Sequence, residues 1–222
     1  MKKKILFLIL YIFIFKIVNA EEIKKDTTII TADGGIKVYQ DEKYYDLIDN
    51  VIIDSENFNL KADNVIAYYG EDFYDLTRII ATGNAEIITT EGAEIRGNEV
   101  TYDIKNGNFS INGNGIFINN ELRVEGEDIQ GEITEINKVK YVKKVEAKDS
   151  NKVFIQNKDM KSYSKSAIYS KENEILELFD EVKIIKNQEI TTGDYANINM
   201  ETNDYSIKSI NNKVQLLINS ED

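Results

Sequence analysis

Hydrophobic and polar residues alternate along most of the chain from residue 27 onwards. Phe109 and Ile111 alternate with polar neighbours, and the later pairs Val153 and Ile155, then Val182 and Ile184, repeat the pattern. Because successive side chains of a strand point to opposite faces of a sheet, this period of two is typical of half-buried strands. No window keeps a period of about 3.6 over the length of a helix. The sequence therefore predicts an all-β fold of short strands.

Turn signals separate these apolar runs. They combine Asn, Asp or Glu with Gly or Asn, at Asp33-Gly34, Asn106-Gly107, Asn112-Gly113, Asn114-Gly115, Asn119-Asn120, Glu172-Asn173 and Asn211-Asn212. Asn-Gly favours tight hairpin turns because both central residues adopt positive φ there. The spacing of the signals predicts strands of about five to seven residues, a common length for strands of globular proteins.

A repeat underlies the alternation. A small or polar step recurs at Asp63, Asn98, Glu127, Lys165 and Asp194, which are separated by 35, 29, 38 and 29 residues. Each unit holds three or four of the short predicted strands and is too small to bury its apolar face alone. Stacked units could bury it in one continuous core.

Four segments resemble a known repeat. Asp49–Ile53, Asn59–Val65, Leu76–Ala85 and Gly97–Asp103 are similar to the OstA-like repeat of the LptA-type family, which serves periplasmic lipopolysaccharide transport. The stretch Leu76–Ala85 is the most specific of them. The similarity is close from residue 46 to 127 and continues in register, more loosely, from 142 to 217.

The resemblance implies a fold and a function. The fold is an antiparallel β-jellyroll that is open at both ends and joins head to tail through its terminal strands, here near Thr27–Thr31 and Val214–Ile218. The implied function is that of a periplasmic bridge that carries lipopolysaccharide from the inner to the outer membrane. Its partners would be an inner-membrane LptC-type protein, an outer-membrane LptD-type protein and further copies of itself.

An apolar interior is the expected binding site for the lipid acyl chains. A buried, unpaired charge is costly, so a lipid conduit needs inward apolar side chains. The alternation supplies Val51, Ile53, Phe58, Leu60, Ile87, Ile95, Phe109, Ile111, Ile116, Ile118, Leu122, Val124, Leu176 and Val182. The residues alone favour an ordinary sandwich core, and the family resemblance favours the lipid-binding interior instead.

Composition narrows the possible chemistry. The 222-residue chain contains no Cys, no His, no Trp and no Pro. It therefore has no thiolate nucleophile, no imidazole base and no Cys or His metal ligand. The carboxylate groups at Glu125–Asp128 and at Glu71–Asp75 lack the spacing of a calcium loop or of a specific glycosidase pair. We expect no enzyme activity, no cofactor and no metal.

The first twenty residues have the pattern of an export signal. Three lysines precede the apolar run Ile5–Phe15, and Val18-Asn19-Ala20 then forms a cleavage site before Glu21. The predicted division is a signal peptide over residues 1–20 and a periplasmic β-domain over 21–222. Retention of this segment as a membrane anchor, as in an LptC-like component, is the alternative. A further alternative for the whole protein is a structural β-repeat protein without a lipid ligand.

Charge is unevenly distributed. Without residues 1–20 the chain has 23 basic and 39 acidic residues, a formal charge of −16, which disfavours nucleic-acid binding. The segment from Lys138 to Lys165, however, contains nine lysines and only three acidic residues. These lysines could meet an anionic lipid head group. Their other interpretation is that they solvate an outward sheet face or protect an edge strand.

Overall fold

The computed structural model describes residues 28–218 except 74, 91, 137–138 and 211–212. The predicted signal segment therefore lies outside the described residues. All regular structure in the described part is β-strand, arranged as one antiparallel sheet. Its strands are β1 (Ile29–Thr31), β2 (Gly35–Tyr39), β3 (Tyr44–Asp54), β4 (Phe58–Tyr69), β5 (Leu76–Thr89), β6 (Glu94–Asp103), β7 (Asn108–Ile118), β8 (Arg123–Ile136), β9 (Val139–Gln156), β10 (Met160–Ser170), β11 (Ile175–Lys186), β12 (Glu189–Asn199), β13 (Tyr205–Lys208) and β14 (Gln215–Ile218). Among the described residues, no helix is long and apolar enough to cross a membrane.

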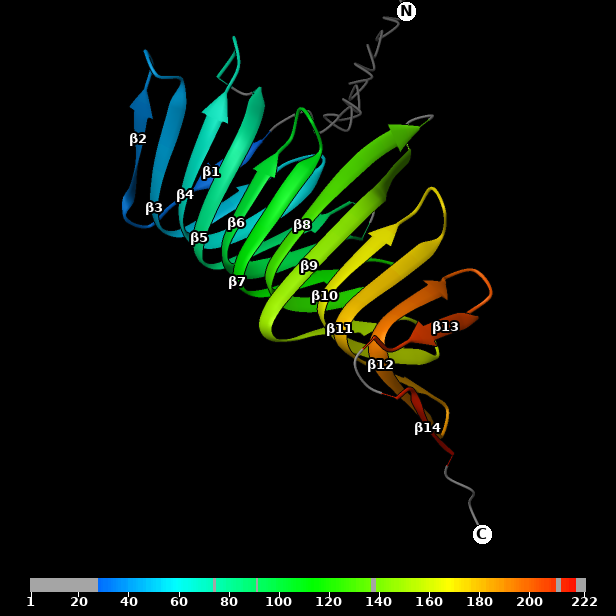
Figure 1. The fold of residues 1–222 in the computed structure, drawn as a ribbon. Helices are drawn as coiled ribbons and strands as arrows, with labels where there is room; N and C mark the ends of the chain where they lie inside the picture. Colours follow the sequence, from blue (N-terminus) through cyan, green and yellow to red (C-terminus); the bar gives the residue numbers. More distant parts are fainter. Residues whose placement is uncertain (1–27, 74, 91, 137–138, 211–212, 219–222) are drawn as a thin grey trace, which may run out of the picture.

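Each long strand is bent near its middle. From β3 to β12 the strands are 10 to 18 residues long, and the pairing between neighbours shifts register at one place inside almost every strand. The bends lie one beside the next, so the single sheet folds into two facing layers (Figure 1). We call the layer that contains β1 and β14 the first layer, and the layer that contains β2 and β13 the second layer.

The bends explain the sequence repeat and correct the predicted strand lengths. Gly83 and Asn84 bend β5, and Gly113 and Asn114 bend β7, all with positive φ. Bulges of this kind need backbone that Gly and Asn adopt readily. The signals at residues 112–115 are therefore not hairpin turns. The prediction of short strands was wrong because a mid-strand bulge and a turn use the same residue types.

Packing between the two layers forms one apolar core. Its members come from every strand from β3 to β12, and the fully buried ones include Leu47, Ile79, Phe117 and Leu178. Ser162, Ser164 and Thr191 are the polar residues buried among the described ones. The alternation thus follows the fold as predicted, with the inward face of both layers apolar.

The sheet does not close on itself. Over the described residues, β1 and β2 pair only with β3, while β13 and β14 pair only with β12. Both layers therefore end in a free edge at each end of the molecule. The two edge strands predicted from the sequence, near 27–31 and 214–218, correspond to β1 and β14; β2 and β13 complete the two edges.

Candidate functional site

The interior between the layers holds nearly all of the predicted inward residues. Twelve of them are buried, with at most 4% of their surface exposed: Val51, Ile53, Phe58, Leu60, Ile87, Ile95, Phe109, Ile111, Leu122, Val124, Leu176 and Val182. Whether they contact lipid stays a prediction. Their side chains nevertheless form the continuous apolar surface that such a role requires.

Ile116 and Ile118 do not lie in this interior. Both are half-buried on the outward side of β7, and Phe117 between them is fully buried. Odd-numbered positions of β7 face the interior on both sides of the bulge at Gly113 and Asn114, from Phe109 and Ile111 before it to Phe117 after it. The inward placement predicted for these two isoleucines was therefore wrong by one residue.

Aromatic side chains connect the two layers at two places. Phe109 from the second layer stacks on Phe117 from the first, with ring centroids 5.2 Å apart. Phe58 from the first layer and Tyr102 from the second also meet edge to face, with ring centroids 6.3 Å apart. The sequence prediction missed Phe117, although this residue continues the alternation of Phe109 and Ile111. The repeat could have indicated it, because Phe117 follows Gly113 by the same four residues that separate the buried Ile87 from Gly83.

Opposite the line of bends, the far ends of the layers face one another along a side that we call the seam. A small cavity of about 120 Å³ lies there, which we call the seam pocket. The first layer contributes Asn57, Thr89, Ala93 and the turn 119–121; the second contributes Tyr102, Ile133, Tyr141 and Val142. The pocket is therefore apolar towards the core and polar towards solvent.

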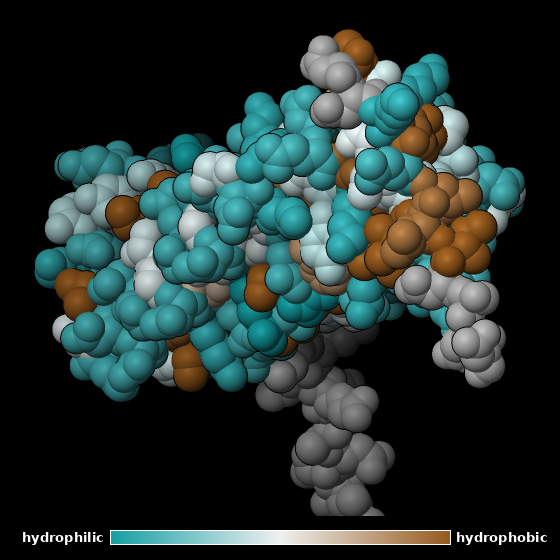
Figure 2. All heavy atoms as spheres, turned by 60° about the horizontal axis from the view of Figure 1, so that its bottom comes forward, coloured by the Kyte–Doolittle hydropathy of each residue, from teal (hydrophilic) through white to brown (hydrophobic). Residues whose placement is uncertain are grey.

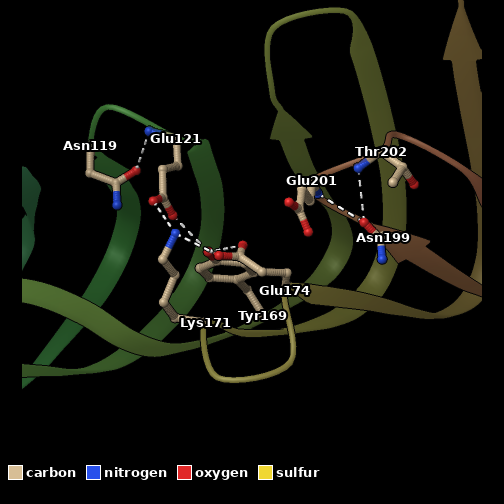
Figure 3. Close-up of polar contacts among 8 residues, drawn as sticks. All are labelled: Asn119, Glu121, Tyr169, Lys171, Glu174, Asn199, Glu201 and Thr202. Atoms are coloured by element: carbon tan, nitrogen blue, oxygen red, sulfur yellow. Dashed lines mark hydrogen bonds and ion pairs between the residues drawn. The ribbon is translucent and has the colours of Figure 1, made fainter.

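Towards β12 the seam is closed by polar contacts. Glu121, in a turn of the first layer, accepts hydrogen bonds from Tyr169 Oη at 2.6 Å and from Lys171 Nζ at 2.5 Å, both from the second layer. Lys171 also pairs with Glu174 at 2.8 Å. We call these four residues the clasp (Figure 3). Nearby, Asn157 donates to Asn203 Oδ1 at 2.8 Å across the same seam.

The clasp residues shift one another's titration. Burial alone would raise the pKa of Glu121, but hydrogen bonds from Lys171 and Tyr169 outweigh it and hold this pKa below its ordinary value. Hydrogen bonds to Glu121 and Glu174 raise the pKa of Lys171. Burial and the neighbouring carboxylates raise the pKa of Tyr169. The clasp is thus fully ionised at Glu121 and Lys171 near neutral pH.

Three of the nine lysines in the lysine-rich segment pair with nearby acceptors. Lys143 contacts Glu132 at 2.8 Å, Lys144 pairs with Glu146, and Lys165 pairs with Glu181 at 3.6 Å. Lys165 also donates to the carbonyls of Ser150 and Asn151. These contacts favour the interpretation that the lysines stabilise and solvate outward faces. Among all the residues that the structure describes, no three acidic side chains are placed to hold a metal ion.

Together these features define a β-jellyroll protein: a bent antiparallel sheet with an apolar interior, a seam along one side and free edges at both ends. A family model described as "LptA/(LptD N-terminal domain) LPS transport protein" matches residues 30–136 and 94–204. The chain therefore belongs to this family of lipopolysaccharide transport proteins. The resemblance noted in the sequence is confirmed.

Comparison with solved structures confirms the fold. The chain is similar to the crystal structure of LptH from Pseudomonas aeruginosa, described as the LptA homologous periplasmic component of the conserved lipopolysaccharide transport device. The TM-score is 0.50 at 12% sequence identity, and the alignment covers 59% of this chain and 96% of LptH. A search of curated proteins gives no match.

Proposed function

We propose that this protein is a periplasmic bridge that binds lipopolysaccharide and carries it from the inner to the outer membrane. Acyl chains would be shielded between the two layers while the sugar head group stays in water. The observation that carries the proposal is the apolar interior, which runs through every long strand and contains only three buried polar residues among those described. Family membership supports the lipid class.

The free edges support head-to-tail assembly. At the N-terminal edge, β1 lies in the first layer and β2, which follows it in the chain, lies in the second. At the C-terminal edge the order is reversed, with β13 in the second layer and β14 in the first. If a second copy placed its β1 and β2 beside β13 and β14, the pairing would be antiparallel in both layers. The apolar interior would then continue from one copy into the next, as β-strand addition at an exposed edge permits.

Apolar side chains at both edges fit the same role. Leu216, Leu217 and Ile218 of β14 are each more than half exposed, and Ile36 and Val38 of β2 are nearly half exposed. Figure 2 shows apolar surface gathered at the end that carries the C-terminal strands. Long exposed apolar edges are usually avoided because they aggregate, so their presence favours a partner.

The proposal extends to the N-terminal segment and to the partner proteins. Residues 1–20 would be a signal peptide removed before Glu21, so that residues 21–222 form the periplasmic domain. In the alternative, an LptC-like component, they would be retained as an anchor. The N-terminal sequence of the protein isolated from the envelope separates these two possibilities. Partners of LptC type and LptD type would pair with the two sheet edges.

Site-specific photocrosslinking tests lipid binding. Ile87 and Ile88 are adjacent in β5, but Ile87 is fully buried in the interior and Ile88 is 40% exposed on the outward face. A photoreactive residue at Ile87, and a second at Ile111, should crosslink to lipopolysaccharide in cells. The same residue at Ile88 should not.

Equal crosslinking from Ile87 and Ile88 would contradict an interior site. Crosslinking from neither inward position, with the variants folded, would favour the structural β-repeat protein without a lipid ligand. Charge reversal at Lys143 and Lys144 tests the head-group role of the lysine-rich segment. If that role is correct, crosslinking from Ile87 falls in this variant.

A further inference from the structure

The interior as it stands is too small for a lipid acyl chain. The seam pocket has a volume of about 120 Å³. That is less than the roughly 150 Å³ of an apolar cavity known to hold one benzene molecule. A larger recess of about 360 Å³ lies beside it at the clasp, but its lining is polar apart from Met200. Further inside, side chains such as Phe117 and Ile111, which are fully buried, fill the space between the layers. If acyl chains bind here, the layers must part.

The structure also shows where parting is easiest. On the side of the bends, every long strand continues covalently from one layer to the other. Along the seam, the clasp, Asn157 and Lys186 join the layers through hydrogen bonds between side chains or between a side chain and a backbone carbonyl. The line of bends can therefore act as a hinge, and the seam is the side that opens.

Contacts across the seam change along its length. Around the seam pocket the second layer presents Tyr102, Ile133 and Val142, and Tyr102 meets Phe58 of the first layer edge to face. Immediately beyond Glu121 they meet through ion pairs and hydrogen bonds, first at the clasp and then at Asn157 and Asn203. Glu121 belongs to both regions, because it lines the seam pocket and also binds Lys171.

Polar contacts of this kind suit a closure that opens repeatedly. Glu121 and Lys171 are 39% and 30% exposed, so water can replace each partner when they separate. An ion pair at this exposure is also weak, because water screens it and competes for both partners. The clasp can therefore hold the seam shut without making its opening prohibitive.

On this basis, and resting on the proposed function, we propose that the seam pocket is the first binding site for a lipid acyl chain. The chain enters sideways from the seam, with its head group left outside at the polar rim. The clasp is the closure that must separate before the chain can extend towards β12. Glu121 couples the two steps, since a chain that occupies the pocket lies against the residue that holds Lys171.

Stopped-flow binding of a fluorescent fatty acid, cis-parinaric acid, to the purified protein tests this inference. Lys171→Met removes the cation and leaves Glu121 and Glu174 to repel one another. The rate of the fluorescence rise that reports burial of the whole acyl chain should increase about fivefold, the effect of weakening closure by one ion-pair network. Lys171→Arg, which keeps the charge, should stay near the wild-type rate.

Arg96→Met is the matched control. Arg96 also lies between two carboxylates, Glu86 at 2.7 Å and Glu94 at 2.6 Å, but all three belong to the first layer and none crosses the seam. This variant loses an equivalent ion-pair network and should leave the rate unchanged. A rise equal to that of Lys171→Met would show a general loss of stability and overturn the inference.

A reversible crosslink tests the opposite effect. The chain has no native cysteine, so Asn157→Cys with Asn203→Cys gives two unique thiols on opposite sides of the seam. Joining them with a short bis-methanethiosulfonate reagent should slow fatty-acid binding at least tenfold, and reduction should restore it. If the wild type binds but neither the clasp variant nor the crosslink changes its rate, the inference is wrong and the proposed function stands. If wild type and all variants bind neither fatty acid nor lipopolysaccharide, both fail.

Discussion

The position of Phe117 gives the most direct test of the strand register. Its side chain is fully buried and stacks on Phe109, whereas its neighbour Ile118 is half-buried on the outward face. Replacing a buried Phe with Ala typically costs about 3–5 kcal/mol, which includes the lost contacts and the cavity left behind. Ile118→Ala should cost about 1 kcal/mol, roughly half of what a fully buried Ile contributes.

Urea unfolding followed by circular dichroism measures this difference. With a slope of about 2 kcal/mol per molar urea, Phe117→Ala should lower the midpoint by about 2 M and Ile118→Ala by about 0.5 M. The slope should be the same in both variants. If Ile118→Ala were the more damaging of the two, Ile118 rather than Phe117 would face the interior, and the register of the second half of β7 would be refuted. Phe117→Leu, with a smaller loss of volume, keeps the comparison measurable if Phe117→Ala does not fold.

Three further predictions follow from single features. Gly83→Ala should lower the free energy of unfolding by about 1–3 kcal/mol in thermal or urea unfolding, because φ is +75° there and the added Cβ would lie 2.2 Å from Asp63 Oδ2. Gly92→Ala, with a similar φ of +85° but open space around it, should cost only about 1 kcal/mol. Because the folded-state pKa of Glu121 is lowered, its contribution to stability is complete above the ordinary glutamate pKa near 4.5 and is lost as the pH falls through the folded value. Glu121→Gln should therefore flatten the decline in melting temperature below that pH, and an unchanged decline would exclude this group as its source. Deletion of residues 214–222 should leave a folded monomer that no longer associates, and an unchanged mass in light scattering would contradict pairing through β14.

Alternation predicted the fold class and most of the interior because burial follows the period of two inside each half-strand. It could not distinguish a bulge from a hairpin turn. At Asn106 and Gly107 the chain reverses direction, whereas at Gly113 and Asn114 it only bends. Both sites use residues that accept positive φ, and pairing with neighbouring strands decides between the two outcomes. That pairing is a long-range property, so local sequence does not contain it.

The clasp lay beyond sequence reasoning for a related reason. Glu121 and Lys171 are 50 residues apart, and nothing in their local sequence separates them from the many other charged residues of this acidic chain. They meet because successive bent strands run in opposite directions between the layers. Every second turn therefore lies in the same layer, at the edge that faces the seam. The turn at 119–122 and the turn at 171–174 lie at the far ends of opposite layers.

The same alternation relates the free edges to the seam. Because each strand crosses from one layer to the other, both terminal edges offer two half-strands and the seam runs the whole length between them. Head-to-tail pairing would extend the seam as well as the interior from one copy to the next. An acyl chain that has entered sideways could then pass between copies without its head group leaving water. The polar closure beyond the seam pocket, rather than the bulk of the core, would set how far along one copy the chain can move before the layers separate again.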